Sequence, residues 1–326
     1  MRIAIIGAGA IGGLVAGYLK LKGGDITLIG HKESISKINS RGLDISGVRG
    51  EFNARIEAHQ RLAYQPDLVI LATKTQDIEK AVKDNLEFIR NSLILTTQNG
   101  AQADNIASNQ LPEKNITSSI VMFGATCLEP GKVIHNFEGP WIIGKINGKN
   151  DENTPKIKDA LKDAFDITIT NEIRGMKYLK IFVNANNCIA AILGCSMQEA
   201  FGDTDISRIS IEIWKEGLRV MEEAGIKLVD LPDFTVERIK RLTSMPIEQS
   251  AKVFSGIMKN LSDEPLYGSI FQSIKRGKPS EIDYINGEFP KLGKAPLNKK
   301  LTELVHQVEK TRKFLSKEEL LTVVKS

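Results

Sequence analysis

The chain has 326 residues, of which 41% are hydrophobic and 26% are charged, and its formal net charge is +4 at pH 7. Two domains are expected, because a single hydrophobic core rarely grows to this length. The small, dispersed positive charge excludes a basic nucleic-acid surface, and no apolar run reaches the roughly 18 residues of a membrane span. The N-terminal apolar run is too short and glycine-rich for a signal peptide, so we expect a cytoplasmic protein.

In the first half of the chain, short apolar strands alternate with helical stretches. Strands are expected at 2–6, 25–29, 67–72, 93–97 and 117–122, and helices at about 11–22, 76–84 and 101–109. This alternation predicts an α/β domain with a Rossmann-type, doubly wound sheet over residues 1–169. A strand insertion is expected over 42–58, and hairpins at the sheet edge over 124–146.

After about residue 170 the apolar periodicity becomes helical throughout. Helices are expected at 172–193, 204–224, 233–244, 247–260, 266–276, 281–292 and 298–313, without a strand signal. The second domain, 170–326, is therefore predicted to be all-α.

Residues 7–12 read G-A-G-A-I-G, directly after the first strand and at the start of a helix. This context is typical of a dinucleotide-binding loop, although a tight turn without a ligand is the alternative. The first glycine permits the turn, the second lets the backbone approach the pyrophosphate, and the third allows close packing of helix on sheet. The residues predicted to bind the cofactor are Gly7, Ala8, Gly9, Ala10, Ile11 and Gly12.

The end of the second strand carries information on the cofactor. NAD-preferring sites place Asp or Glu there to hold the ribose hydroxyls. Here His31 and Lys32 follow the strand, and these two potential cations favour the 2′-phosphate of NADP (NADPH). Glu33 weakens this argument, because its negative charge would repel a 2′-phosphate. The alternative is that His31 and Lys32 are ordinary loop residues.

Polar residues also follow the third and fourth parallel strands. Lys74 lies in A-T-K-T-Q, and Asn99 in T-Q-N-G-A. Ligands of open α/β sheets bind outside the carboxyl ends of the strands, so both are candidate ligand contacts. For Asn99, followed by Gly100, turn formation is the alternative.

Two further segments lie in the helical half. Lys180 and Asn184 are four residues apart and share one face of an otherwise apolar helix. An exposed lysine is the alternative to a functional one. In P-S-E-I-D-Y-I-N-G, residues 279–287, Ser280 is predicted to cap a helix with Glu281 in its first turn.

Together these elements resemble the ketopantoate reductase (2-dehydropantoate 2-reductase) family over nearly the whole chain. The motifs occur in the family's order, and S-E-I-D-Y-I-N-G at 280–287 is the most specific. The resemblance implies NADPH-dependent reduction of 2-dehydropantoate to pantoate, on the route to pantothenate and coenzyme A. It also makes a homodimer plausible.

Residue by residue, the resemblance implies that Lys180 is the catalytic lysine, and the general acid that protonates the ketone oxygen of a 2-oxo acid. Glu281 is implied as an active-site glutamate that holds the lysine, the substrate or the cofactor. Asn99 is implied to lie near nicotinamide and substrate, Lys74 to bind the cofactor, and Asn184 and Ser269 to bind the substrate.

Three positions depart from the family pattern. His31 stands where an arginine is frequent, and Cys188 and Gln198 stand where asparagines contact the substrate. Gln198 is still predicted to bind substrate, with one more methylene of reach. Asn187 lies about 100° around the helix from Cys188, so it compensates only where the helix is irregular.

Two other functions stay open. One is a reductase of another 2-oxo or 3-hydroxy acid, such as a β-hydroxyacid dehydrogenase, which shares the two-domain build and a Lys-x-x-x-Asn helix. The other is a dinucleotide-binding sensor without turnover, which Lys180 and Glu281 disfavour because a sensor needs no proton donor.

Overall fold

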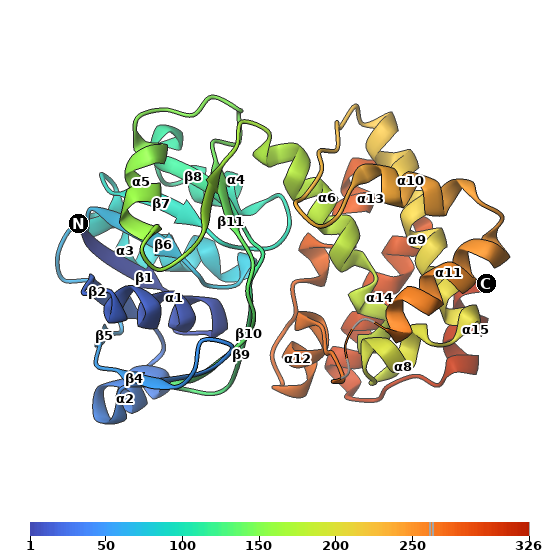
Figure 1. Cartoon of the computed structure of the whole chain (residues 1–326), viewed down its shortest axis with the longest axis horizontal. Helices are drawn as coiled ribbons and strands as arrows, with labels where there is room; N and C mark the ends of the chain where they lie inside the picture. The colour runs from blue at the N-terminus through green and yellow to red at the C-terminus, as the bar shows by residue number, and fades with distance from the viewer. Residues whose placement is uncertain (261, 263, 326) are drawn as a thin grey trace. The chain divides into compact units, whose positions relative to one another are not determined.

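The computed structural model describes residues 1–260, 262 and 264–325, and the chain divides into two compact units. The first unit is Met1–Arg174, and the second begins at Gly175 (Figure 1). Among the described residues, no helix combines the length and apolarity that crossing a membrane requires.

An eight-stranded sheet in the order β12-β11-β8-β7-β6-β1-β2-β5 forms the centre of the first unit. Its strands are β1 (Arg2–Ile6), β2 (Asp25–Ile29), β5 (Glu57–His59), β6 (Leu68–Leu71), β7 (Leu93–Thr96), β8 (Ile116–Val121), β11 (Trp141–Gly144) and β12 (Ile167–Ile169). The strands from β8 to β5 are parallel, whereas β11 runs antiparallel to β8. Strand order reverses at β1, which places the topological switch point between β1 and β6.

Helices cover both faces of this sheet, as predicted for a doubly wound fold. They are α1 (Ala10–Leu21), α2 (Lys32–Arg41), α3 (Ile78–Ile89), α4 (Ala103–Ser108) and α5 (Asn153–Leu161), with the short 3-10 helices η1 (Thr75–Asp77) and η2 (Glu113–Asn115). Ile3 and Ile5 of β1 pack in the cluster that holds α1 and α5, whereas Ala4 and Ile6 pack with α3 and α4. Burial on both faces explains why these strands are apolar throughout instead of alternating.

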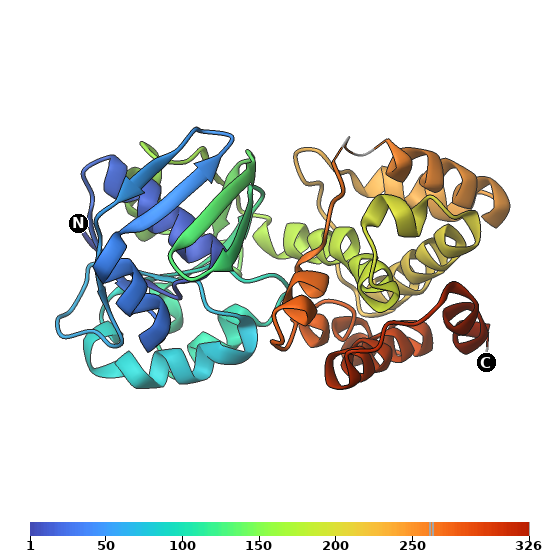
Figure 2. The same cartoon turned by 90° about the horizontal axis from the view of Figure 1, so that it is seen from below.

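The hairpin predicted at the edge of the main sheet belongs instead to a second sheet, so that part of the prediction is wrong. This sheet has the order β4-β3-β10-β9 and comprises β3 (Leu43–Gly47), β4 (Phe52–Ala54), β9 (Gly124–Glu129) and β10 (Lys132–Phe137). Figure 2 shows the green hairpin beside the blue strands. Val133 and Ile45 pack on α1. A Cβ added at Gly13 would lie 2.9 Å from Val133, and one added at Gly17 would lie 2.0 Å from Ile45. Burial against α1 stabilises the hairpin there.

The second unit is helical, as predicted. Its helices are α6 (Ile173–Ala185, which starts at the end of the first unit), α7 (Asn187–Leu193), α8 (Met197–Phe201), α9 (Thr204–Glu223), α10 (Val236–Ser244), α11 (Ile247–Lys259), α12 (Ser269–Lys275), α13 (Glu288–Leu292), α14 (Pro296–Thr311), α15 (Lys317–Lys325) and the 3-10 helix η3 (Ile282–Tyr284). Within the described part of this unit, the β pairing consists of a single bridge between Leu231 and Phe234.

Residues 281–292 do not form the single helix that was predicted. The chain makes one turn in η3, leaves helical geometry at Ile285 (φ −117°, ψ −89°) and resumes as α13. The next residue, Asn286, is completely buried. A buried amide needs hydrogen-bond partners, and those of Asn286 lie on other helices, so the local helix gives way.

Helix α6 is fixed by aromatic packing in the core of the second unit. The Phe182 ring meets Phe289 edge to face at 5.3 Å, and the Trp214 Nε1 group donates to the Phe182 carbonyl oxygen at 2.8 Å. A Cβ at Gly217 of α9 would lie 2.7 Å from the Phe289 ring and 2.9 Å from the Phe182 ring. These contacts hold the helix that carries Lys180 and Asn184 on a rigid support.

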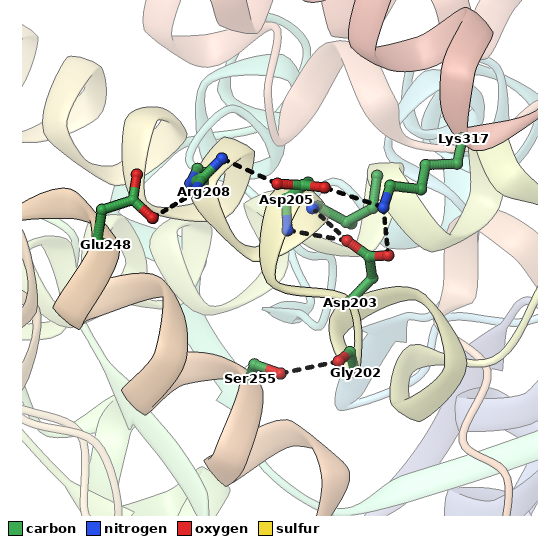
Figure 3. Close-up of polar contacts among 8 residues, drawn as sticks. Gly202, Asp203, Asp205, Arg208, Glu248, Ser255 and Lys317 are labelled. Atoms are coloured by element: carbon green, nitrogen blue, oxygen red, sulfur yellow. Dashed lines mark hydrogen bonds and ion pairs between the residues drawn. The ribbon is translucent and has the colours of Figure 1, made fainter.

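The start of α9 joins helices that are distant in sequence (Figure 3). Asp203 caps α9 by accepting from the Asp205 and Ile206 N–H groups at 2.8 and 3.3 Å. Lys317 of α15 donates to the carboxylates of Asp203 and Asp205 at 2.5 and 3.0 Å. The cap is worth about 1 kcal/mol, and the partly exposed ion pairs less, so these contacts mainly fix α15 on α9.

Candidate active site

The loop between β1 and α1 combines tight folding with open space. Gly7 has a φ of 123°, and a Cβ there would lie 2.5 Å from the carbonyl carbon of Ala72. A Cβ at Gly12 would lie 1.9 Å from the Gly7 oxygen, whereas nothing lies within 4 Å of one at Gly9. Gly7 and Gly12 therefore let the chain pack closely, and Gly9 leaves room for a ligand.

The start of α1 presents backbone N–H groups. Gly9 is exposed and precedes the helix, and Ala10 and Ile11 are half-buried in its first turn. The Gly13 N–H donates to the Gly9 oxygen at 2.8 Å, the first bond of the helix. The N–H groups before Gly13 have no acceptor within the helix, and the positive end of the helix dipole attracts an anion.

The end of β2 lies beside this loop. A Cβ at Gly30 would lie 2.7 Å from the Cβ of Ala8. His31 is exposed with an extended backbone, and Lys32 is the first residue of α2. Both side chains therefore start from the positive end of a second helix.

Glu33 is the one carboxylate that weakened the predicted NADP preference. Its Oε1 atom pairs with the Lys37 Nζ atom at 3.1 Å, one turn along α2. Both side chains are exposed, so the pair is weak, but it partly offsets the negative charge of Glu33.

Lys74 and Asn99 follow the neighbouring strands β6 and β7, and both are half-buried. The Thr75 hydroxyl donates to the Asn99 carbonyl oxygen at 3.4 Å. The Gln98 side-chain amide donates to the Leu71 carbonyl oxygen at 2.8 Å. These contacts bind the two loops to each other at the carboxyl ends of their strands.

The first unit thus gathers its predicted residues at one edge of the sheet, around the switch point. We call Gly7–Gly12, His31, Lys32, Lys74 and Asn99 the strand-end cluster. It combines two helix N-termini with the side chains of His31, Lys32 and Lys74, a composition that suits a polyanion.

In the second unit, Lys180 and Asn184 lie on one face of α6 and are half-buried. Loss of hydration and the positive charge of Lys177 lower the pKa of Lys180 to about 8, although the Glu281 carboxylate acts to raise it. Lys180 is therefore mostly protonated at pH 7, yet releases its proton more readily than an ordinary lysine.

The segment around Glu281 is fixed to α14. The Ser280 N–H donates to the Glu309 carboxylate at 2.7 Å, and the His306 ring meets the Asp283 carboxylate at 2.9 Å. Ser280 accepts from the Ile282 N–H at 3.3 Å, but Glu281, not Ser280, occupies the cap position of η3, so the predicted cap is displaced by one residue. Glu281 is half-buried between these two anchors.

Asn286 joins the two sequence motifs of the second unit. Its Nδ2 group donates to the Ala185 carbonyl oxygen and to the Asn298 Oδ1 atom, both at 3.0 Å. In a regular helix Ala185 would accept from the Ile189 N–H, which here donates to the Asn186 oxygen at 3.0 Å. The inserted side chain explains why α6 ends and α7 begins at this point.

This break decides which neighbours of Asn184 are accessible. Cys188 is completely buried, its thiol donates to the Ala185 oxygen at 3.1 Å, and burial raises its pKa to about 12. Asn187 is half-buried, and a Cβ at Gly268 would lie 3.1 Å from the Asn187 Cβ. Asn187 therefore lies beside the start of α12, where Ser269 is exposed.

The Gln198 side chain is bound to a loop of its own unit. Its Oε1 atom accepts from the Leu266 N–H at 2.9 Å, and its Nε2 group donates to the Glu264 and Ser262 oxygens at 2.8 and 3.2 Å. These bonds account for the residue as a brace of the loop. Its predicted substrate contact stays a prediction, without support from this geometry.

We call Lys180, Asn184, Ser269 and Glu281 the helical cluster. The charges of Lys180 and Glu281 interact, and Asn187, the first residue of α7, lies against Gly268, the residue before Ser269. In the part of the chain that the structure describes, the Asn184 amide and the Ser269 hydroxyl make no hydrogen bond, so both can bind a polar ligand.

Sequence reasoning missed Lys177 and Asn286. Lys177 is 2% exposed and one turn before Lys180, so two lysines on one face of an apolar helix were the available signal. Asn286 lies in the motif that was singled out, but its inward orientation depends on a partner 101 residues away.

Comparisons with known proteins agree over both units. A family model described as ketopantoate reductase PanE/ApbA matches residues 3–148, and the corresponding C-terminal model matches 172–309. A 2-dehydropantoate 2-reductase of Pyrococcus horikoshii is 33% identical over 322 residues, which cover 95% of this chain and 98% of the relative.

Solved structures are similar over nearly their whole length. A PanE/ApbA family ketopantoate reductase from Ralstonia eutropha JMP134 has a TM-score of 0.80 at 21% identity and covers 96% of this chain and 99% of its own. A D-mandelate dehydrogenase, solved with NADH and anilino(oxo)acetate, has a TM-score of 0.80 at 25% identity, with coverages of 95% and 99%.

Proposed function

The chain belongs to the ketopantoate reductase family, and on this premise we propose that it reduces 2-dehydropantoate to pantoate with NADPH, on the route to pantothenate and coenzyme A. The observation that carries the proposal is Lys180, one turn before Asn184 on α6: loss of hydration and the charge of Lys177 lower its pKa to about 8, and the Glu281 carboxylate opposes this shift. A lysine with this pKa in such surroundings favours acid–base chemistry over binding alone.

A nicotinamide dinucleotide fits the strand-end cluster. The open space over Gly9 admits a pyrophosphate, and the N-terminus of α1 supplies N–H groups for its oxygens. His31 and Lys32 offer positive charge to a 2′-phosphate, which is why we propose NADPH. When bound, the reduced cofactor supplies a hydride to the ketone carbon of the substrate.

Lys180 manages the charge that grows on the ketone oxygen. Its ammonium group hydrogen-bonds that oxygen, polarises the carbonyl and donates a proton from Nζ as the alcohol forms. Glu281 keeps the lysine charged in spite of Lys177 and the loss of hydration. Asn184 and Ser269 hold the polar groups of the acid, so that the carbonyl stays in place against Lys180.

The decisive test is NADPH oxidation by the purified protein with a panel of 2-oxo acids. The reaction is followed at about 340 nm, where the reduced cofactor absorbs. We expect 2-dehydropantoate to have the highest kcat/KM, and NADPH to be preferred over NADH. His31→Asp places a carboxylate at the end of β2 and should reduce the cofactor preference. Cofactor binding without turnover of any acid would favour the sensor instead.

A second candidate is reduction of an aromatic 2-oxo acid with NADH. The similar D-mandelate dehydrogenase was solved with NADH, and Tyr267, two residues before Ser269, is 46% exposed and stacked on Phe271 at 5.0 Å. An aromatic substrate could extend this stack. A higher kcat/KM for phenylglyoxylate than for 2-dehydropantoate would favour this function. The main proposal also includes a homodimer. Light scattering of the purified protein would measure its mass in solution and so test this.

A further inference from the structure

The run Asn184-Ala-Asn186-Asn187 offers three amides, and they differ sharply in environment. Asn186 is 4% exposed, and its buried amide atoms find no partner among the described residues. Asn187 is half-buried and makes no side-chain hydrogen bond within the described part of the chain. A dissolved ligand can therefore reach the amides of Asn184 and Asn187 but not that of Asn186.

Lys180 and Asn184 lie one turn apart on α6, whereas Asn187 follows the break at Asn186 and is the first residue of α7. Cys188, the next residue, lies in the core, where its thiol donates to the Ala185 oxygen. The Asn187 Cβ and Cγ atoms would lie 3.1 and 3.2 Å from a Cβ at Gly268, so Asn187 touches the residue before Ser269.

The helix break holds this arrangement. Asn286 occupies the Ala185 oxygen, and the Asn286 partner, Asn298, is itself held by Glu216, whose Oε1 atom accepts from the Asn298 amide at 2.9 Å. Asn286 and Asn298 are completely buried, so the orientation of the break does not depend on mobile surface groups.

We propose that Asn187 binds the terminal hydroxyl of the substrate, beside Ser269, and is the residue that selects a 4-hydroxy-2-oxo acid. This inference rests on the proposed function. An amide can both donate to and accept from a hydroxyl, which the Cys188 thiol cannot do with comparable strength. If Asn187 fills this role, an asparagine at position 188 is not needed for discrimination.

The test compares 2-dehydropantoate with 3,3-dimethyl-2-oxobutanoate, the same acid without the hydroxyl, in wild type, Asn187→Ala and Cys188→Ala. Asn187→Ala should lower kcat/KM for 2-dehydropantoate about 10- to 100-fold, chiefly through KM, because one hydrogen bond to the substrate is lost. For the hydroxyl-free acid, kcat/KM of Asn187→Ala should stay within about 3-fold of the wild-type value. A general loss of activity would instead lower kcat/KM for both acids by the same larger factor. Cys188→Ala, the control from the core, should preserve the ratio of the two acids.

Each other outcome has one meaning. If the wild type does not reduce 2-dehydropantoate, the proposed function itself is wrong, and the inference falls with it. If the wild type reduces it but Asn187→Ala lowers both acids equally or neither, only the role of Asn187 is overturned. The same holds if Cys188→Ala abolishes the discrimination.

Discussion

The strand-end cluster and the helical cluster are built by different physical means. In the first unit, the backbone makes the site: glycines permit close approach, and two helix N-termini provide positive potential. In the second unit, side chains make the site, and their orientation depends on hydrogen bonds between segments far apart in sequence. The first kind of site follows from local sequence, whereas the second needs the tertiary fold.

The difference matters for how each site tolerates change. A backbone site fails when a side chain enters its space, because the N–H groups themselves cannot be mutated. A side-chain site fails when a supporting hydrogen bond is lost, even if every contacting residue is still present. The two clusters should therefore respond to different substitutions, with different kinetic consequences.

The largest effect on activity is expected at Lys180, where a substitution should lower kcat without changing cofactor binding. Lys180→Ala should lower kcat by roughly 10²- to 10⁴-fold, the usual contribution of a general acid. The Kd for NADPH should change little, because the strand-end cluster is intact. Single-turnover kinetics and cofactor titration measure the two quantities. A variant with wild-type kcat would reduce Lys180 to an ordinary helix lysine.

The backbone site is tested by two glycines with opposite surroundings. Gly9→Val enters open space, so it should preserve the fold but weaken NADPH binding about 10- to 100-fold, the usual 1–3 kcal/mol of overpacking. Gly12→Val meets the Gly7 oxygen, so it should also lower the melting temperature. Calorimetric titration and thermal unfolding distinguish them. Unchanged cofactor affinity in Gly9→Val would exclude this loop as the pyrophosphate site.

The same contrast explains which predictions from sequence were successful. The strand β1, the glycine loop and the start of α1 were predicted correctly, because period, composition and turn chemistry act over a few residues. The hairpin over 124–146 was misplaced because its partner strand, β3, lies about ninety residues earlier in the chain. A register across such a distance cannot be derived from local alternation.

In the helical half, local patterns gave the helical character, but the helices expected at 172–193 and 281–292 are each interrupted, and the use of their residues was not visible. The spacing of Lys180 and Asn184 put them on one face, as observed, but nothing local showed that Asn286 would interrupt the next turn. Gln198 had the chemistry of a ligand contact, and its three bonds to backbone became visible only in the fold. The roles of Asn99, Ser269 and Glu281 stay predictions that experiments must test.

Asn286 offers the direct test of a site held by a remote side chain. In Asn286→Ala the Ala185 oxygen is free to accept from the Ile189 N–H, so the helix becomes regular and shifts Asn187. We expect about a 10-fold loss of kcat/KM for 2-dehydropantoate and an unchanged Kd for NADPH, with a stability cost of about 1–3 kcal/mol for the lost buried hydrogen bonds. Urea unfolding measures the last. Unchanged kinetics would mean that the break does not position the site.

The pH profile of the reaction probes the charges around Lys180. In the reductive direction kcat/KM should fall as pH rises through about 8, because Lys180, the proposed general acid, loses its proton. Lys177→Met removes a charge that lowers this pKa, so the midpoint should move to higher pH. Glu281→Gln removes a charge that raises it, so the midpoint should move to lower pH. Lys177→Arg keeps the charge and is the control; equal midpoints in all variants would refute the assignment.

The smallest effect compares two histidines, one in each unit. His135 of β10 is completely buried beside the Tyr18 hydroxyl at 2.8 Å, and its Nε2 atom lies 3.9 Å from the Glu138 carboxylate. Burial lowers its pKa, an effect to which the Arg49 charge adds and which Glu138 opposes. His306 of α14 also loses hydration, but hydrogen bonds to its carboxylate partners outweigh this and raise its pKa.

The opposite shifts predict opposite pH dependences of local stability. Below the unfolded pKa of about 6.5, the unfolded chain binds a proton that buried His135 resists, so acidification destabilises the first unit. The contribution of His306 is complete below about 6.5 and is lost as pH rises through its higher folded pKa, so the same acidification stabilises the second unit. Its side chain is 46% exposed, which keeps that effect below about 1 kcal/mol.

Hydrogen exchange between pH 5.5 and 7.5, corrected for intrinsic rates, should show protection of β10 falling and that of α14 rising on acidification. His135→Gln and His306→Gln should each flatten only the slope of their own unit. Slopes of one sign in both units, or slopes that survive the substitutions, would show that other groups control the pH response.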